Sequence, residues 1–182
     1  MDINQFNELF QQRMAAIKAF AEGDKIKDIA GTEAINHFRS SFDNEGFTDS
    51  TLEPWKDVAR RDPASPWYGH NGFSTEKPAK KIKKGDTELV GNFSQARTTA
   101  KILTGGTSRL REGLFYKYID TGVRITSPTG YGRVHQFGLP AKIYGKATFQ
   151  MTPRPFMGRS VLLTKNIKKE INDEFIKILK GQ

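Results

Sequence analysis

Three histidines, His37, His70 and His135, are the side chains of this chain best suited to acid–base chemistry or metal binding near neutral pH. A metal site needs ligands at short, clustered spacings such as H-x-x-x-H, and none occurs around them. His37 adjoins Phe38 on a predicted amphipathic helix, as surface or boundary residues do, and His70 lies in a predicted turn, WYGHNG. His135 lies in YGRVHQFGLP, residues 131–140, where it either takes part in chemistry or holds the chain in shape.

Few other groups in the chain are suited to catalysis. The absence of cysteine excludes thiol nucleophiles, disulfides and cysteine-ligated zinc. The carboxylates of residues 101–182 lie mostly on the predicted last helix, so a general acid–base pair would have to be assembled across the fold. The glycine-rich segment LTGGTSRL matches neither phosphate-loop nor dinucleotide patterns and is predicted to be a turn. We therefore predict a protein that is not an enzyme and that holds no cofactor and no metal ion.

The charge of the chain is unevenly distributed. The formal net charge is +9, of which residues 1–60 carry −4, residues 61–100 carry +3 and residues 101–182 carry +10. A basic surface attracts polyanions, so nucleic acid or an acidic protein is a candidate partner of the C-terminal half. No segment approaches the roughly 20 apolar residues of a membrane span, and we expect no membrane association. The N-terminal residues lack the pattern of a secretory signal.

Hydrophobic spacing predicts helices at both ends of the chain. Apolar residues recur at steps of three and four over residues 3–20, and the predicted first helix ends at Gly23 in a left-handed conformation. Asp24 is expected to cap a second helix that ends near residue 43, with a bend possible at Gly31. A last helix carries an apolar side and a lysine-rich side. Its apolar residues are Leu163, Ile167, Ile171, Phe175, Ile178 and Leu179.

The middle of the chain, from Phe47 to about Lys101, loses this periodicity and is rich in proline and glycine. We expect a loop-rich insertion at about residues 60–101, forming an arm or flap. Trp55 and Trp67 are predicted to pin it to the core, or to form a patch that faces a partner. The residues proposed for such a partner contact are Trp67, Tyr68, Lys80, Lys81, Lys83 and Lys84.

Strand patterns appear after this insertion. The segment LREGLFYKYIDTGVRITSP predicts a β-hairpin, YGRVHQFG a single helical turn that ends at Gly138, and AKIYGKATFQM one further strand with a bulge at Gly145. The prolines of TPRPFMGRS predict a stiff extended arm that leads into the last helix. The expected fold is one α+β domain, residues 1–182, with N-terminal helices and a C-terminal helix packed on a small antiparallel sheet.

Four segments of the chain carry a resemblance to a known family. In order, GYGRVHQFG, TPRPFMG and a charged C-terminal helix resemble the closing signature of the phage virion morphogenesis family, the tail-completion proteins of Mu-like phages. NEGFTDSTLEPWKDVARR and ILTGGTSRLREGLFYKYID are similar to two upstream family segments. The matched positions are Tyr131, His135, Gln136, Phe137, Gly138, Pro153, Arg154, Pro155, Phe156, Met157 and Gly158. The chain departs from the pattern at Leu139-Pro140, where the family often has a second glycine.

The resemblance implies a structural protein that completes the tail or joins it to the head. It would work as a ring of its own copies, expected to be hexameric, beside connector and tail proteins. It would act first in the bacterial host cytoplasm and then form part of the tail or neck of the virion. His135 and Gln136 would fasten the turn to backbone groups, Phe137 would fill the core, and Gly138 would supply a positive φ. Phe156 would point into the sheet, directed by Pro153 and Pro155.

Two other functions are compatible with the sequence. The basic C-terminal half is typical of a nucleic-acid-binding protein, and a ring around a DNA channel would also lie near DNA without sequence specificity. The sequence lacks recognition-helix and stacked-aromatic motifs that would add such specificity. A hydrolase whose metal-dependent activity requires His135 is the remaining hypothesis.

Overall fold

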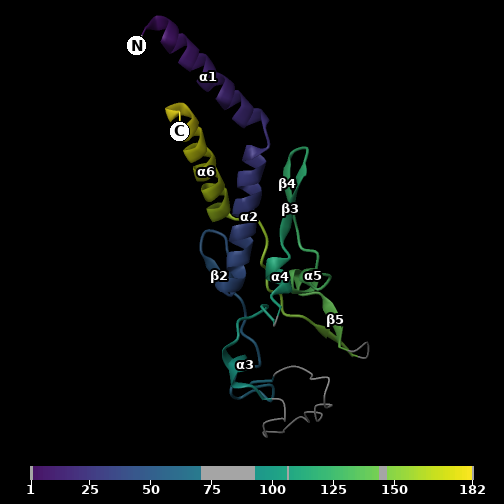
Figure 1. Cartoon of the computed structure of the whole chain (residues 1–182). Helices are drawn as coiled ribbons and strands as arrows, with labels where there is room; N and C mark the ends of the chain where they lie inside the picture. Colours follow the sequence, from purple (N-terminus) through teal and green to yellow (C-terminus); the bar gives the residue numbers. More distant parts are fainter. Residues whose placement is uncertain (1, 71–92, 106, 144–146, 182) are drawn as a thin grey trace.

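The computed structural model describes residues 2–70, 93–105, 107–143 and 147–181, and it is an α+β fold, as predicted. Its helices and strands follow one another along the chain as labelled in Figure 1. They are α1 (Ile3–Glu22), α2 (Lys25–Asp43), β1 (Gly46–Thr48), β2 (Leu52–Pro54), α3 (Gln95–Thr99), α4 (Arg109–Glu112), β3 (Phe115–Ile119), β4 (Gly122–Thr126), α5 (Gly132–Phe137), β5 (Pro140–Ile143), β6 (Ala147–Gln150) and α6 (Val161–Lys180).

Within the described residues, the strands form three separate two-stranded ladders in place of the one small sheet that was predicted. Each ladder is an antiparallel hairpin of neighbouring strands: β1 with β2, β3 with β4, and β5 with β6. The strands are only three to five residues long. Proline at 54 and 140 lies at the ladder ends, where its missing N–H cannot donate to the partner strand. Helix α2 takes the place of a shared sheet, because it contacts β1, β3 and β4.

The predicted N-terminal helices are confirmed, but the junction between them differs. Gly23 is extended, with φ −84° and ψ −178°, and its N–H donates to the Ala19 carbonyl. An extended Gly23 lets α2 start directly after α1, whereas a left-handed Gly23 would change the direction of the chain at the end of α1. The Asp24 side chain does not cap α2, since its backbone is already helical, and it accepts a bond from Lys27 at 3.0 Å instead.

Gly31 lies in the interior of α2, where glycine is usually unfavourable. A Cβ added there would lie 2.6 Å from the ring of Tyr116 on β3. The missing side chain therefore allows the β3–β4 hairpin to lie directly against α2, as Figure 1 shows. The sequence indicated the cost of this glycine and a possible bend, but it did not indicate the Tyr116 ring beside it.

The core lies along α2 and is built largely from aromatic rings. Phe42 is fully buried and its ring centroid lies 5.2 Å from that of Phe156 and 5.7 Å from that of Trp55. The other members are Ala34, Ile35, Phe38, Phe47, Ile102, Leu110, Leu114 and Leu163. His37 is also buried, and its Nε2 lies 2.9 Å from the Thr48 carbonyl oxygen, so its predicted place at the surface is wrong.

The two ends of the loop-rich insertion lie together. Arg60 donates to the carbonyls of Arg97 at 3.1 Å and Ala100 at 2.6 Å, and His70 forms a β-bridge with Phe93. Trp55 is buried and pins this region to the core, as predicted. Trp67 is 41% exposed and does not, because it stacks on His70 at the rim. The predicted contact residues Lys80, Lys81, Lys83 and Lys84 lie outside the described residues.

The segment AKIYGKATFQM forms the two strands of a hairpin, β5 and β6, where one strand was predicted. Ile143 pairs with Ala147, so the predicted bulge position, Gly145, lies outside the described residues, between them. The following residues up to Arg159 have no regular structure, as predicted for the proline-rich arm. No helix in the described part of the chain is long and apolar enough to cross a membrane.

Candidate functional site

The segment that carries His135 folds as the short helix α5 and ends as predicted. Gly138 has φ 63° and its N–H donates to the Val134 carbonyl, which is a left-handed C-cap. A Cβ at this position would lie 2.8 Å from the Met151 carbonyl oxygen and 2.9 Å from Cδ of Pro153. Glycine is required here both for the backbone conformation and for the close passage of the proline-rich arm.

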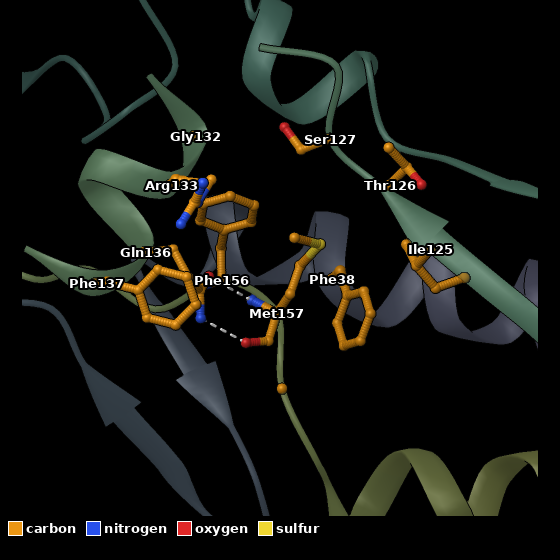
Figure 2. Close-up of a pocket in the computed structure, with 11 residues that line it drawn as sticks. Phe38, Ile125, Thr126, Ser127, Gly132, Arg133, Gln136, Phe137, Phe156 and Met157 are labelled. Carbon is orange, nitrogen blue, oxygen red and sulfur yellow. Dashed lines mark hydrogen bonds between the residues drawn. The ribbon is translucent and has the colours of Figure 1, made fainter. Parts of the chain in front are cut away.

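Gln136 fastens α5 to that arm through its side-chain amide. Its Oε1 accepts the backbone N–H groups of Phe156, at 3.0 Å, and Met157, at 3.1 Å, and its Nε2 donates to the Met157 carbonyl at 2.7 Å. Figure 2 shows the side chain reaching across from α5 to the arm, where dashed lines mark bonds to its backbone. One amide therefore satisfies three backbone groups of an irregular segment, the role predicted for Gln136.

His135 contributes to the same connection through its backbone, since its carbonyl accepts the Arg154 N–H at 2.7 Å. His135 was predicted to fasten the turn to backbone groups, and it does so through this carbonyl and not through its ring. The ring lies edge-on to Tyr131, with centroids 6.1 Å apart, and its buried Nδ1 has no hydrogen-bond partner in the described part of the chain. Burial, together with the charge of Arg154, lowers the pKa of His135 below its usual value, which favours the neutral imidazole.

A neutral histidine can act as a general base when a carboxylate orients it. No such carboxylate bonds to His135 among the residues that the structure describes. Nor do these residues include a group of three or more histidines or carboxylates that could hold a metal ion.

The proline-rich arm buries every second side chain, since Arg154 and Phe156 are buried whereas Pro153 and Pro155 are exposed. Arg154 is 7% exposed and donates to the Lys56 carbonyl at 3.1 Å. Phe156 is fully buried, in contact with the aromatic core of α2, where a place against the sheet was predicted. The backbone carbonyl of Pro155 accepts the indole N–H of Trp55 at 2.6 Å. The arm therefore joins α5, the core and the start of the loop-rich insertion.

Phe137 does not fill the core, and that prediction is wrong. Its side chain is 64% exposed because α5 turns it away from Phe156. It borders a cavity of about 460 Å³ whose lining is mainly apolar. Figure 2 shows Phe137 and Phe38 on either side of Met157 in this cavity. The complete lining is Phe38, Ile125, Thr126, Ser127, Gly132, Arg133, Gln136, Phe137, Phe156, Met157 and Gly158.

Asp49, in the upstream segment NEGFTDS, binds the start of α6. Its carboxylate accepts the Val161 N–H at 2.7 Å, and its carbonyl accepts the Ser160 hydroxyl at 3.1 Å. Ser160 in turn caps α6 by accepting the Leu163 N–H at 3.0 Å. Sequence reasoning missed Asp49, because its partner lies more than a hundred residues away. Ser160 carried a local signal, a serine directly before an apolar helical pattern.

Glu45 is a second residue that sequence reasoning missed. It forms a paired hydrogen bond with Arg61, at 2.6 and 2.8 Å, and accepts the Ile102 N–H at 2.6 Å. The hydrogen bond from Arg61 is the main reason that the pKa of Glu45 is lowered.

The four segments of the family resemblance meet around α2 and the proline-rich arm. No family model matches the chain, and neither a curated protein nor a solved structure matches it.

Proposed function

We propose that this protein is a non-enzymatic assembly protein of a phage or prophage, which completes the tail or joins it to the head as a ring of its own copies. The observation that carries this proposal is a pair of uncovered apolar surfaces in different places on one chain. The first, which we call the α1 stripe, consists of Ile3, Phe6, Phe10 and Met14. The second is Phe137 with its adjoining cavity.

The α1 stripe has the spacing of a buried helix face, yet its side chains are 46–68% exposed. Gly181, at the end of α6, lies beside Arg13, since a Cβ added there would be 3.7 Å from that guanidinium. The residues before Arg13 therefore project beyond α6, as Figure 1 shows. A helical segment of this length is marginal in water without a partner, and a contiguous apolar face of this kind marks an interaction surface.

A second copy of the chain is the occupant that fits both surfaces. Ring closure needs two different surfaces that are complementary to each other, because head-to-tail contacts repeat around the ring. The first twelve residues carry Asp2 and Glu8 and no lysine or arginine, whereas the one charged residue that lines the Phe137 cavity is Arg133. The opposite charges favour insertion of the α1 stripe of one copy against Phe137 of the next.

The resemblance adds the phage setting to this proposal. Trp55 meets Pro155, Asp49 meets Ser160, and Gln136 meets Met157, so the segments that resemble the family are in contact with one another. In this setting, the neighbours of the ring are connector and tail proteins. The protein would act in the host cytoplasm during assembly and then in the tail or neck.

Nucleic-acid binding by the basic C-terminal half is the alternative. The lysines of α6 support it only in part, because Lys169 lies 2.9 Å from Asp173 and Lys177 lies 3.2 Å from Glu174. These pairs neutralise part of the positive charge within the helix itself. A free phosphate-binding surface would leave its lysines unpaired.

Sedimentation equilibrium tests self-association directly. Phe10→Asp places a charge in the α1 stripe, and Gln12→Asp introduces the same charge about 200° around the helix, given about 100° per residue. Wild type and Gln12→Asp are expected to associate as the concentration rises, while Phe10→Asp and Phe137→Asp remain monomeric with unchanged helix content. Equal association in all four proteins would contradict the assigned surfaces, and a monomeric wild type would contradict the ring.

A further inference from the structure

A second cavity adjoins α5 and has the opposite character. Its volume is about 270 Å³, and its lining is polar and basic. Arg60, Arg97, Lys101 and Arg109 line it together with His135. The remaining lining residues are Leu103, Thr104, Gly105, Thr107, Leu110 and Tyr131, so no carboxylate lines it. Basic side chains from two parts of the chain, and the α5 histidine, therefore face a common space.

The structure holds these positive charges close together. Arg60 is fixed by bonds from its guanidinium to the carbonyls of Arg97, Ala100 and Lys101, at 2.6 to 3.1 Å. Burial, followed by the charge of Arg97, lowers the pKa of Arg60. Like charges repel, so holding them around one cavity costs free energy. An anion bound between them offsets this repulsion and stabilises the arrangement.

Two buried side-chain nitrogen atoms at this cavity are left without hydrogen-bond partners in the described part of the chain. Nε of Arg97 and Nδ1 of His135 are buried and bond to no group in the described part of the chain. Arg109 is exposed and forms no ion pair with any described residue. Lys101 differs from Arg109, because its Nζ donates to the Asp43 carbonyl at 2.9 Å and forms an ion pair with the Asp43 carboxylate at 3.9 Å. Polar groups that are buried unpaired in this way are usually satisfied by a ligand or water.

The described residues of the glycine-rich segment LTGGTSRL, which was predicted from the sequence to be a turn, contribute Leu103, Thr104, Gly105, Thr107, Arg109 and Leu110 to the lining. Leu103 has φ 60° and Gly105 has φ 54°, and Ser108, which follows the lining, has φ 48°. A positive φ is uncommon for leucine and serine and tends to occur at functional sites. Backbone in which left-handed residues alternate with others turns its N–H groups inward and forms concave anion-binding sites.

We propose that this cavity binds a phosphate group. Arginine is suited to it because the planar guanidinium offers paired donors that match phosphate oxygens. The Thr107 hydroxyl adds a neutral donor to the same lining, whereas the Thr104 hydroxyl donates to the Lys101 carbonyl at 2.9 Å. The phosphate belongs either to a nucleic-acid backbone or to a small phosphorylated molecule. This assignment goes beyond the assembly role and does not depend on it.

Isothermal titration with inorganic phosphate tests the site, with sulfate as the matching oxyanion. Arg109→Gln removes one charge from the lining, and Arg124→Gln removes one from the exposed face of β4, outside the cavity. We expect Arg109→Gln to weaken phosphate binding by about tenfold or more and Arg124→Gln by less than about twofold. Both residues are exposed, so thermal unfolding without ligand is expected to match wild type.

The same proteins titrated with a short single-stranded oligonucleotide identify the source of the phosphate. If it is a nucleic-acid backbone, the oligonucleotide binds more tightly than inorganic phosphate, and Arg109→Gln reduces the salt slope by about one. If it is a small molecule, Arg109→Gln weakens phosphate binding and leaves oligonucleotide binding unchanged. The proposal is overturned if wild type binds neither phosphate nor sulfate, or if the two variants weaken phosphate binding equally.

Discussion

Gln136→Ala is the substitution that most directly tests how α5 is held on the proline-rich arm. It removes three hydrogen bonds to backbone groups of Phe156 and Met157. At a net contribution of about 0.5–1.5 kcal/mol each, their sum is roughly 1.5–4.5 kcal/mol. Gln136 is half-buried, so water can reach some of the freed groups. We therefore expect the free energy of unfolding to fall by about 2 kcal/mol.

Urea unfolding monitored by circular dichroism measures this loss as a lower midpoint with an unchanged slope. Gln12→Ala on α1 is the matched control, since Gln12 is exposed and bonds to no described residue, and its effect is expected within about 0.5 kcal/mol. Gln136→Glu keeps the acceptor for the two N–H groups but sets a carboxylate oxygen against the Met157 carbonyl, so its loss is expected to be at least as large as that of Gln136→Ala. A Gln136→Ala midpoint equal to that of Gln12→Ala would refute the role assigned to this amide.

Three further predictions concern the core, one helix contact and one titrating group. Phe156→Ala removes a fully buried ring and is expected to lower the unfolding free energy by about 3–5 kcal/mol in the same urea assay. Gly31→Ala is expected to lower it by about 1–3 kcal/mol, because the added methyl overlaps the Tyr116 ring and outweighs alanine's better helix propensity. Burial lowers the pKa of His135 in the folded state. As the pH falls below about 6.5, His135 is therefore protonated in the unfolded chain at a higher pH than in the folded protein. Stability is therefore expected to decrease as the pH falls through this range, and less so in His135→Asn, as thermal unfolding at a series of pH values would measure.

Each of these predictions has a clear contrary result. A stabilised Gly31→Ala would mean that Tyr116 does not lie against α2. A loss in Phe156→Ala no larger than that of an exposed phenylalanine would place Phe156 outside the core. An identical pH dependence of stability in wild type and His135→Asn would mean that His135 titrates normally in the folded protein.

Local patterns predicted the elements well. The first two helices, the β3–β4 hairpin and the turn that ends at Gly138 each depend on contacts within a few residues, which the spacing of apolar residues and turn signals records. The same patterns failed where a residue's environment comes from elsewhere. The sequence predicted a buried side chain for Phe137, yet α5 ends in an orientation that exposes the Phe137 side chain.

The site was predicted only in part, for the same reason. Gln136 was predicted correctly to bind backbone groups, whereas Phe156 was predicted to point into the sheet and is instead buried in the aromatic core of α2. The partners of Asp49 lie about 110 residues further along the chain, and no local rule connects them. The basic cavity is lined by Arg60 and His135, which are far apart in the sequence, and by residues of a segment that was predicted to be only a turn. Such sites become visible only when the folded chain brings distant segments together.

Electron microscopy of particles from a producing strain that lacks this gene tests the assembly role most directly. Complementation with the intact gene and with the Phe10→Asp variant supplies the controls. The account predicts filled heads beside unattached or malformed tails in the deletion strain, restored by the intact gene and not by Phe10→Asp. Normal infectious particles in the deletion strain would contradict it.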